Sequence, residues 1–285
     1  MHQSWKGISN NSQQLLFPVT MDAVPVCFIE EVVLQLERLN NSIKGPQEVS
    51  KLSSIWGRIT KLAVLEVYLS RRKLAVFSLK CDEEPVAVEE LGQITIQRIE
   101  ILDNIGYELD CHPLTKANFE LLRKSPWRNY PCELSIRYSG ANYHPVVDQL
   151  CLMPSRVTKF KVFSYITLPR KPLARIMENG NLRSFECYSG LYLTADLLPL
   201  LLKFVASKDL SHFTVVIGKS SPVSCETFIN GMIDAFLSRE RTKPFRFCVG
   251  ERYEHLCGRF TGTSMAEKVE ASFITDNYAA VLLAI

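Results

Sequence analysis

The sequence predicts an α/β fold in which short strands alternate with helices. From residue 132 onwards, short runs of alternating apolar residues recur, and the segments between them can be helical. The runs begin at Leu134, Phe160, Phe185, Phe213, Phe245 and Phe273, with successive spacings of 26, 25, 28, 32 and 28 residues. A period of this kind indicates a domain built from β-α repeats, each of which buries its apolar face against its neighbours.

The N-terminal part of the sequence predicts helices instead. Two stretches carry apolar residues at helical spacing, and a polar loop at 40–50 joins them. Their key positions are Pro25, Phe28, Val32, Leu36, Leu52, Ile55 and Trp56. The second pattern runs on through Ile59, Leu62, Ala63 and Val67 towards Arg71, which predicts a continuing helix. Two short helices cannot bury both of these apolar faces by themselves, so the following domain or a partner protein must cover them.

This N-terminal pattern resembles the F-box. Val24-Pro25 stands where that family has Leu-Pro, and Leu52-Ser53-Ser54-Ile55-Trp56 stands for its late Val-Ser-x-x-Trp. The opening Met-Asp-Ala-Val-Pro at 21–25 is similar to the start of the divergent nematode F-box-like proteins. The resemblance implies that the seven key positions bind a Skp-type linker protein, with Trp56 as the main anchor. It implies a disordered leader at 1–20, an F-box-like helical segment at 21–72 and a β-α repeat substrate-recognition domain at 73–285.

The segment that follows predicts two strands and a helix. Residues 74–79 are apolar and β-prone, and the acidic turn at 82–85 ends them. The alternating, β-branched run at 94–99 predicts a second strand. Thr115 is placed to cap a helix that carries Phe119, Leu121 and Leu122.

The repeat region holds one strong helical pattern and three weaker ones. Residues 224–240 keep the amphipathic spacing without a miss behind a Ser224 cap, and Asp196 is expected to cap a helix at 197–206. Residues 145–153 and 172–179 predict shorter helices. The strand-plus-helix unit resembles that of leucine-rich-repeat horseshoes, although the leucine-rich consensus is absent. The alternative is an ordinary α/β domain whose elements happen to be evenly spaced.

In a parallel array with helices on one side, alternate strand residues point to the opposite, open face. With Leu134, Phe160 and Phe185 pointing inward, the outward positions mix aromatic residues with charges of both signs. This composition suits protein recognition. The residues predicted to bind a target are Arg137, Lys161, Phe163, Glu186, Tyr188 and Arg246. The alternative is that a loop covers this face and makes it merely structural.

Composition restricts the class of protein. The 285 residues are 47% hydrophobic, which supports a sizeable core, and the net charge of +3 comes from scattered basic residues. We therefore expect neither nucleic-acid binding nor membrane insertion. The nine cysteines include no Cys-x-x-Cys pair, which predicts reduced thiols in the cytoplasm or nucleus. Cys248, His255 and Cys257 come closest to a metal cluster, but a core role suits their spacing better.

Catalysis has little support in the sequence. No phosphate-binding glycine loop, nucleophile elbow or zinc-protease helix is present, and the five histidines lie in unrelated local settings. We therefore expect no enzyme activity and no cofactor. The resemblance predicts a substrate-recognition adaptor of a Skp-cullin-F-box ubiquitin ligase. The alternative is a non-enzymatic interaction or structural repeat protein whose N-terminal helices only cap the repeats.

Overall fold

The computed structural model describes residues 62–69, 75–92, 94–103, 111–125, 130–137, 145–163, 170–239, 245–263, 266–274 and 279–284. All of them lie in one compact unit, Lys61–Ile285. The F-box-like positions between Pro25 and Trp56 therefore fall outside the described residues, as does the leader at 1–20.

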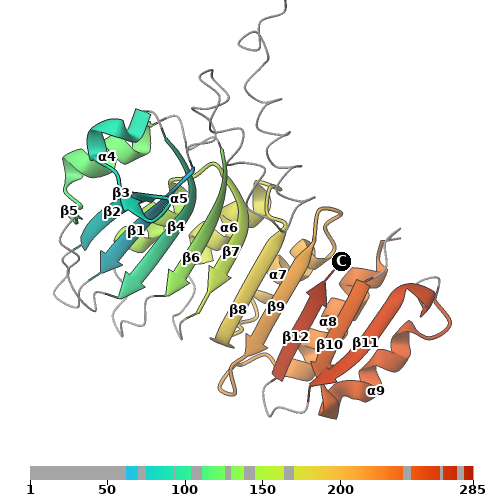
Figure 1. Cartoon of the computed structure of the whole chain (residues 1–285). Coiled ribbons are helices and arrows are strands. Elements are labelled where there is room, and N and C mark those ends of the chain that lie inside the picture. Colours follow the sequence, from blue (N-terminus) through green and yellow to red (C-terminus); the bar gives the residue numbers. More distant parts are fainter. Residues whose placement is uncertain are drawn as a thin grey trace, which may run out of the picture. The chain divides into compact units, whose positions relative to one another are not determined.

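The described residues form a mixed α/β structure around a single, mostly parallel sheet (Figure 1). Its strands run in the order β11-β10-β12-β9-β8-β7-β6-β4-β1-β2-β3, and β5 pairs with β2. Their bounds are β1 Leu62–Leu69, β2 Ala75–Cys81, β3 Glu84–Pro85, β4 Thr95–Asp103, β5 His112–Pro113, β6 Pro131–Arg137, β7 Arg156–Val162, β8 Ser184–Leu191, β9 His212–Ile217, β10 Phe245–Gly250, β11 Val269–Ile274 and β12 Ala279–Ala284.

Neighbouring strands from β1 through β4, β6, β7 and β8 to β9 pair in parallel. The sheet departs from this direction at both ends. Strand β2 is antiparallel to β1, and β12 is antiparallel to both β9 and β10, between which it lies. The regular part of the sheet is therefore a run of parallel strands, as the spacing of the apolar runs predicted.

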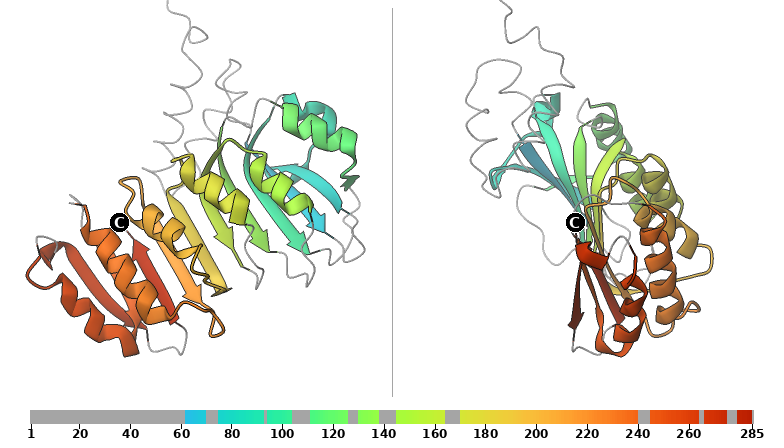
Figure 2. Two further views of the ribbon diagram at one scale, coloured as in Figure 1. Left: turned by 180° about the vertical axis from the view of Figure 1, so that it is seen from behind. Right: turned by 90° about the vertical axis from the view of Figure 1, so that its right-hand side faces the viewer.

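Helices connect the parallel strands. Their bounds are α4 Lys116–Lys124, α5 Val146–Leu152, α6 Arg170–Glu178, α7 Leu198–Val205, α8 Cys225–Leu237 and α9 Glu254–Cys257, with 3-10 turns η2 Val88–Gly92, η4 Glu251–Tyr253, η5 Gly258–Phe260 and η6 Ala266–Lys268. Figure 2 shows α5, α6, α7 and α8 side by side on one face of the sheet. The opposite face, which we call the open face, carries no helix of the described part of the chain and is turned to the viewer in Figure 1.

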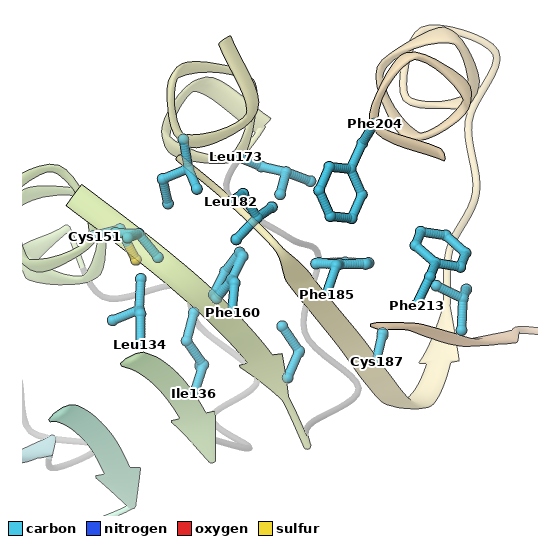
Figure 3. Packing of buried hydrophobic residues seen from close by; sticks show 14 of the residues in the cluster. Leu134, Ile136, Cys151, Phe160, Leu173, Leu182, Phe185, Cys187, Phe204 and Phe213 are labelled. Carbon is cyan, nitrogen blue, oxygen red and sulfur yellow. The ribbon is translucent and has the colours of Figure 1, made fainter. Parts of the chain in front are cut away.

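The core lies between the sheet and the helix layer. Phe160, Phe185 and Phe213 occupy register-matched positions on three adjacent strands, and each is 0% exposed. Neighbouring rings along this row have centroids 5.8 Å apart. Figure 3 shows Leu173 of α6 and Phe204 of α7 pointing down onto them. The row ties the strands to the helices, because the Phe213 ring also packs against Phe204 of α7 and Phe228 of α8.

Five of the six predicted alternating runs lie in strands β6 to β10, and the run that begins at Phe273 overlaps only the last two residues of β11. The strands expected at 74–79 and 94–99 are confirmed as β2 and β4. The helices expected at 145–153, 172–179 and 224–240 are confirmed as α5, α6 and α8. The inward positions Leu134, Phe160, Phe185 and Phe213 are fully buried. Strand β12 was not predicted.

Two helix caps were predicted correctly and one was wrong. The side chains of Thr115 and Ser224 accept hydrogen bonds from the backbone N–H groups of Asn118 and Thr227, at 3.2 and 3.0 Å. They thereby satisfy N–H groups that have no partner inside the helix. Asp196 does not cap α7. The cap position is Leu197, whose side chain has no hydrogen-bond acceptor, and the backbone N–H groups of Leu197 and Leu198 both donate to the Thr194 carbonyl instead.

The helix predicted to continue through Leu62, Ala63 and Val67 is wrong. Residues Leu62–Leu69 form strand β1, in which every second residue is 0–1% exposed. A period of two is the signature of a strand with one covered face. The strand pairs with both β2 and β4, so this segment belongs to the sheet.

Candidate functional site

The open face carries two rows of mostly polar side chains that strand register aligns. Each row crosses neighbouring strands through residues that are direct register partners. The first row is Glu66, Glu100, Ser135, Lys161, Glu186 and Thr214, and the second is Val64, Arg98, Glu133, Lys159, Ser184 and His212. Because alternate residues share a face, both rows lie opposite the buried phenylalanines.

Ion pairs link charged members of the two rows. Lys161 Nζ lies 2.8 Å from Glu133 Oε1, and Lys159 Nζ lies 3.1 Å from Glu186 Oε1. Further along the sheet, Arg98 pairs with Glu100 at 3.3 Å. The charges on this part of the open face are thus largely compensated within the protein. A long, uncompensated basic stripe, which nucleic-acid backbones require, is not formed by these residues.

One arrangement of four side chains occurs twice on the open face. On β8, Glu186 accepts hydrogen bonds from the Tyr188 hydroxyl at 2.6 Å and the Ser184 hydroxyl at 3.1 Å, and it pairs with Lys159. On β1 the corresponding carboxylate is Glu66, and its partners are Tyr68 at 2.7 Å, Ser78 at 3.3 Å and Lys80 at 2.9 Å. The Glu-x-Tyr spacing places both side chains on the same face of a strand.

Burial raises the pKa of the Glu186 carboxyl, but the bonds from Tyr188, Lys159 and Ser184 outweigh it and hold that pKa below its usual value. The same balance lowers the pKa of Glu66. Each carboxylate is therefore ionised at neutral pH and fixes the tyrosine beside it. Glu186 is only 6% exposed, so its role on this face is to support Tyr188.

Beside this arrangement lies a stack that we call the aromatic cluster: Arg137, Phe163 and Tyr188. The Phe163 and Tyr188 rings are nearly parallel, with an interplanar angle of 17° and centroids 5.2 Å apart. The Arg137 guanidinium carbon lies 4.8 Å from the Phe163 centroid. Arg137 ends β6, Phe163 directly follows β7, and Tyr188 lies in the second half of β8, so the cluster lies towards the carboxyl ends of three neighbouring parallel strands.

The aromatic cluster is exposed yet held in place. Phe163 is 39% exposed and Tyr188 is 47% exposed, whereas most large apolar side chains of the described residues are buried. The Phe163 N–H donates to the Ile136 carbonyl at 2.9 Å, and Glu186 holds the Tyr188 hydroxyl. No ion pair within the described residues neutralises Arg137. Rings fixed in this way lose little conformational entropy on binding, and aromatic residues and arginine dominate protein interfaces.

The structure brings together five of the six residues predicted to bind a target. Arg137, Phe163 and Tyr188 form the cluster, Glu186 supports it, and Lys161 lies in the adjoining polar row. Arg246 is separate, because β9 and β12 lie between its strand and β8, a distance of about 14 Å at about 4.8 Å per strand. It pairs instead with Glu270 on β11 at 3.3 Å.

The seven residues predicted to bind a Skp-type linker lie outside the described residues. They are Pro25, Phe28, Val32, Leu36, Leu52, Ile55 and Trp56. Sequence reasoning also missed several polar members of the open face. Glu66 and Tyr68 were missed because their segment was interpreted as a helix. Lys159 was missed although it shares the strand face of Lys161, which a strict count of alternate residues would have revealed.

The described residues contain no group of three or more His, Cys, Asp or Glu side chains placed to hold a metal ion. Burial raises the pKa of the Cys132 and Cys151 thiols, so both stay protonated and behave as small core residues. The ring of His212 contacts the Thr214 hydroxyl at 2.9 Å, and burial lowers its pKa, so it is neutral at pH 7.

None of the helices in the described ranges combines the length and the apolar character that a membrane crossing requires. Comparisons with models of protein families, with curated proteins and with solved structures gave no match to this chain.

Proposed function

We propose that this chain is a substrate-recognition adaptor of a Skp-cullin-F-box ubiquitin ligase. In this proposal the residues before β1, which carry the F-box-like pattern, bind a Skp-type linker. The β-α domain then holds a protein target on its open face, and the chain itself performs no chemistry. The observation that carries the proposal is the exposed aromatic cluster on a sheet face that carries no helix of the described residues.

We further propose that the β-α domain is a degenerate relative of leucine-rich-repeat domains. Parallel strands from β6 to β9 alternate with helices that lie on one face, which is how such repeats stack. In repeat domains of this architecture, the sheet face is the usual surface for holding a partner. The antiparallel strand β12 ends the regular pattern after β9.

Charge compensation on the open face favours a protein target over a nucleic acid. Lys159, Lys161 and Arg98 already pair with carboxylates, whereas no ion pair within the described residues engages Arg137, which lies beside two aromatic rings. A protein segment can satisfy both features, by placing a carboxylate on Arg137 and an apolar side chain on Phe163.

The linker interface is tested by a pull-down of the full chain with a purified Skp-type linker. We expect micromolar or tighter binding by the wild-type chain, and loss of binding in the Phe28→Ala, Trp56→Ala double variant, because large apolar side chains anchor such interfaces. A folded wild-type chain that shows no binding to the linker would refute the adaptor proposal. The alternative of a repeat protein whose N-terminal helices only cap the repeats would then replace it.

The target surface is tested by proximity labelling from the full chain in cells in which the proteasome is inhibited. Phe163→Ala should remove the labelled target, since the stack on Tyr188 and Arg137 is lost. Phe273→Ala is the matched control, because Phe273 is also 39% exposed but lies on β11, away from the cluster. Equal labelling by all three proteins would show that the aromatic cluster does not hold the target.

A further inference from the structure

The helix side of the domain holds a cavity of about 660 Å³ between α4, α5 and α6, which we call the α4–α5 groove. It is lined by Leu114, Thr115, Lys116, Phe119, Glu120, Arg123, Val146, Gln149, Leu152, Met153 and Arg175. Packing within the helix layer explains its position. Helices α5 and α6, α6 and α7, and α7 and α8 pack against one another, whereas α4 has no such close helix neighbour in the described part of the chain.

The sequence gives α4 and α5 two different faces each. On α4, Leu122 is 0% exposed and anchors the helix to the core. The groove is lined by α4 residues at 116, 119, 120 and 123, which is the i, i+3, i+4, i+7 spacing of one helix face. On α5, Val147 and Leu150 are buried in the core, whereas Val146, Gln149 and Leu152 line the groove.

Five of the eleven residues that line the groove are apolar, and we call these five its apolar wall: Leu114, Phe119, Val146, Leu152 and Met153. Phe119 and Val146 pack partly against the core and leave the rest of their surface to the cavity. Leu152 is half-buried, and Met153, the next residue in the chain, is 2% exposed. A partner that covered these side chains would remove apolar surface from water, which favours binding.

The rim of the groove is basic. Lys116, Arg123 and Arg175 are exposed cations, and Glu120 is the carboxylate among them. Glu120 pairs with Arg123 at 3.1 Å on the same helix. No ion pair within the described residues engages Lys116 or Arg175. Three cations and one carboxylate leave a net charge of +2 around an apolar wall, so the complementary ligand is acidic and partly apolar.

We propose that the α4–α5 groove binds an acidic amphipathic helix of a partner protein. Such a helix would place its apolar side chains on Phe119, Val146 and Leu152, and its carboxylates beside Lys116 and Arg175. A small anionic molecule fits less well, because small-molecule sites enclose most of their ligand. Most residues that line this groove are instead exposed or half-exposed. This proposal is independent of the adaptor function, since it concerns the opposite side of the sheet.

The test measures binding of labelled helical peptides of about three turns by fluorescence anisotropy with the full chain. Every peptide has apolar residues at i, i+3, i+4 and i+7, and the remaining positions are acidic, neutral or basic. We expect the acidic peptide to bind most tightly and the basic one least. Charge reversal in a Lys116→Glu, Arg175→Glu double variant should lower the affinity for the acidic peptide by about tenfold or more. In this variant the basic peptide should bind most tightly and the acidic one least.

The matched control is Lys124→Glu, Lys171→Glu. Both lysines are exposed. Lys124 lies on α4, as Lys116 does, and Lys171 lies on α6, as Arg175 does, but neither lysine lines the groove. This control should keep wild-type affinity for the acidic peptide, and both double variants should keep the wild-type melting temperature. A Leu152→Ala variant should lower the affinity for every peptide regardless of its charge, because the substitution removes part of the apolar wall.

Three results would overturn the proposal. One is that no peptide binds below millimolar concentration. Another is that the control double variant loses as much affinity as the Lys116→Glu, Arg175→Glu variant. The third is that dodecanoate, a small anionic amphiphile, binds in the groove more tightly than any peptide, which would make it a small-molecule site.

Discussion

Tyr188 combines an exposed ring with a fixed hydroxyl group. Its ring stacks on Phe163, and its hydroxyl donates to a carboxylate that is itself held by Lys159 and Ser184. Partial burial and the Glu186 charge together raise the pKa of Tyr188 to about 12. The pKa of the Tyr188 hydroxyl therefore reports whether Glu186 still holds it.

We predict that Glu186→Gln lowers the pKa of Tyr188 from about 12 towards its ordinary value of 10.0, because the neighbouring negative charge is removed. The folded wild-type protein holds this proton more tightly than the unfolded chain. The contact thus contributes its full stability below pH 10, and the contribution is lost as the pH rises from 10 towards about 12. Tyrosine ring NMR shifts, assigned with a Tyr188→Phe variant, measure the titration.

Tyr253 provides the control for this titration, because burial and a hydrogen bond with Cys225 raise its pKa to about 12 without any contribution from Glu186. Its titration should be the same in the wild type and in Glu186→Gln. If Tyr188 also titrates identically in both proteins, the Glu186 hydrogen bond does not hold its ring.

At the scale of residues, strand alternation alone predicted which side chains share the open face. It placed Arg137, Phe163 and Tyr188 there correctly, because each follows a buried inward residue of its own strand, Leu134, Phe160 or Phe185, by three positions. The pairing of Lys159 with Glu186 could not be predicted in the same way. It depends on the register between two strands, and the sequence carries no local signal for that register.

Helices α7 and α8 begin differently although both are amphipathic. Ser224 caps α8 through a side-chain hydrogen bond to the Thr227 N–H at 3.0 Å, whereas α7 begins at a buried leucine with no side-chain cap. Helix α8 carries six buried residues, so its start fixes much of the core around Phe213.

We predict that Ser224→Ala lowers the free energy of unfolding by about 1 kcal/mol, because it leaves a helix N–H without its partner. Urea unfolding measures this change. Ser220→Ala is the control, since Ser220 is exposed in the loop before α8, and its effect should stay within about 0.5 kcal/mol. Equal losses in the two variants would mean that the cap does not stabilise α8.

At the scale of elements, the sequence predicted the longest patterns well and failed on β1. Leu62, Ala63 and Val67 fit the apolar spacing of a helix, while Ala63, Leu65 and Val67 fit that of a strand. A short, nearly continuous apolar run cannot separate the two periods. Pairing with both β2 and β4 favours the strand, and this tertiary contribution is invisible in the local sequence.

At the scale of the whole molecule, strand order is what the sequence could not supply. The even spacing of the apolar runs predicts that successive strands are neighbours, and this holds from β6 to β9. It fails after β9, where β12 inserts ahead of β10 and β11. No feature of the Ala279–Ala284 segment specifies which two strands it will separate.

We predict that Val281→Pro loosens β10 and β11 from the rest of the sheet. Val281 pairs with Val215 of β9 and Val249 of β10, and proline removes an N–H from a strand that has partners on both sides. Hydrogen exchange should show lost protection in β9, β10 and β11 and little change in β6 and β7.

Val281→Thr is the matched control, because it keeps the N–H and a β-branched side chain. It should retain wild-type protection in all these strands. Uniform loss of protection over the whole sheet in Val281→Pro would contradict the view that β12 is the local link.

The place of β12 also dictates an order of events on the ribosome. Strands β6 to β9 can pair with one another as they emerge. Strands β10 and β11 can pair with each other, but they cannot be joined to β9 until residues 279–284, which form β12, have been translated. At about 5–20 residues per second, the stretch from β9 to β12 takes about 3–12 s to synthesise. During that interval β9 is an uncovered edge on the nascent chain, so we expect chaperones to engage the chain at this stage of synthesis.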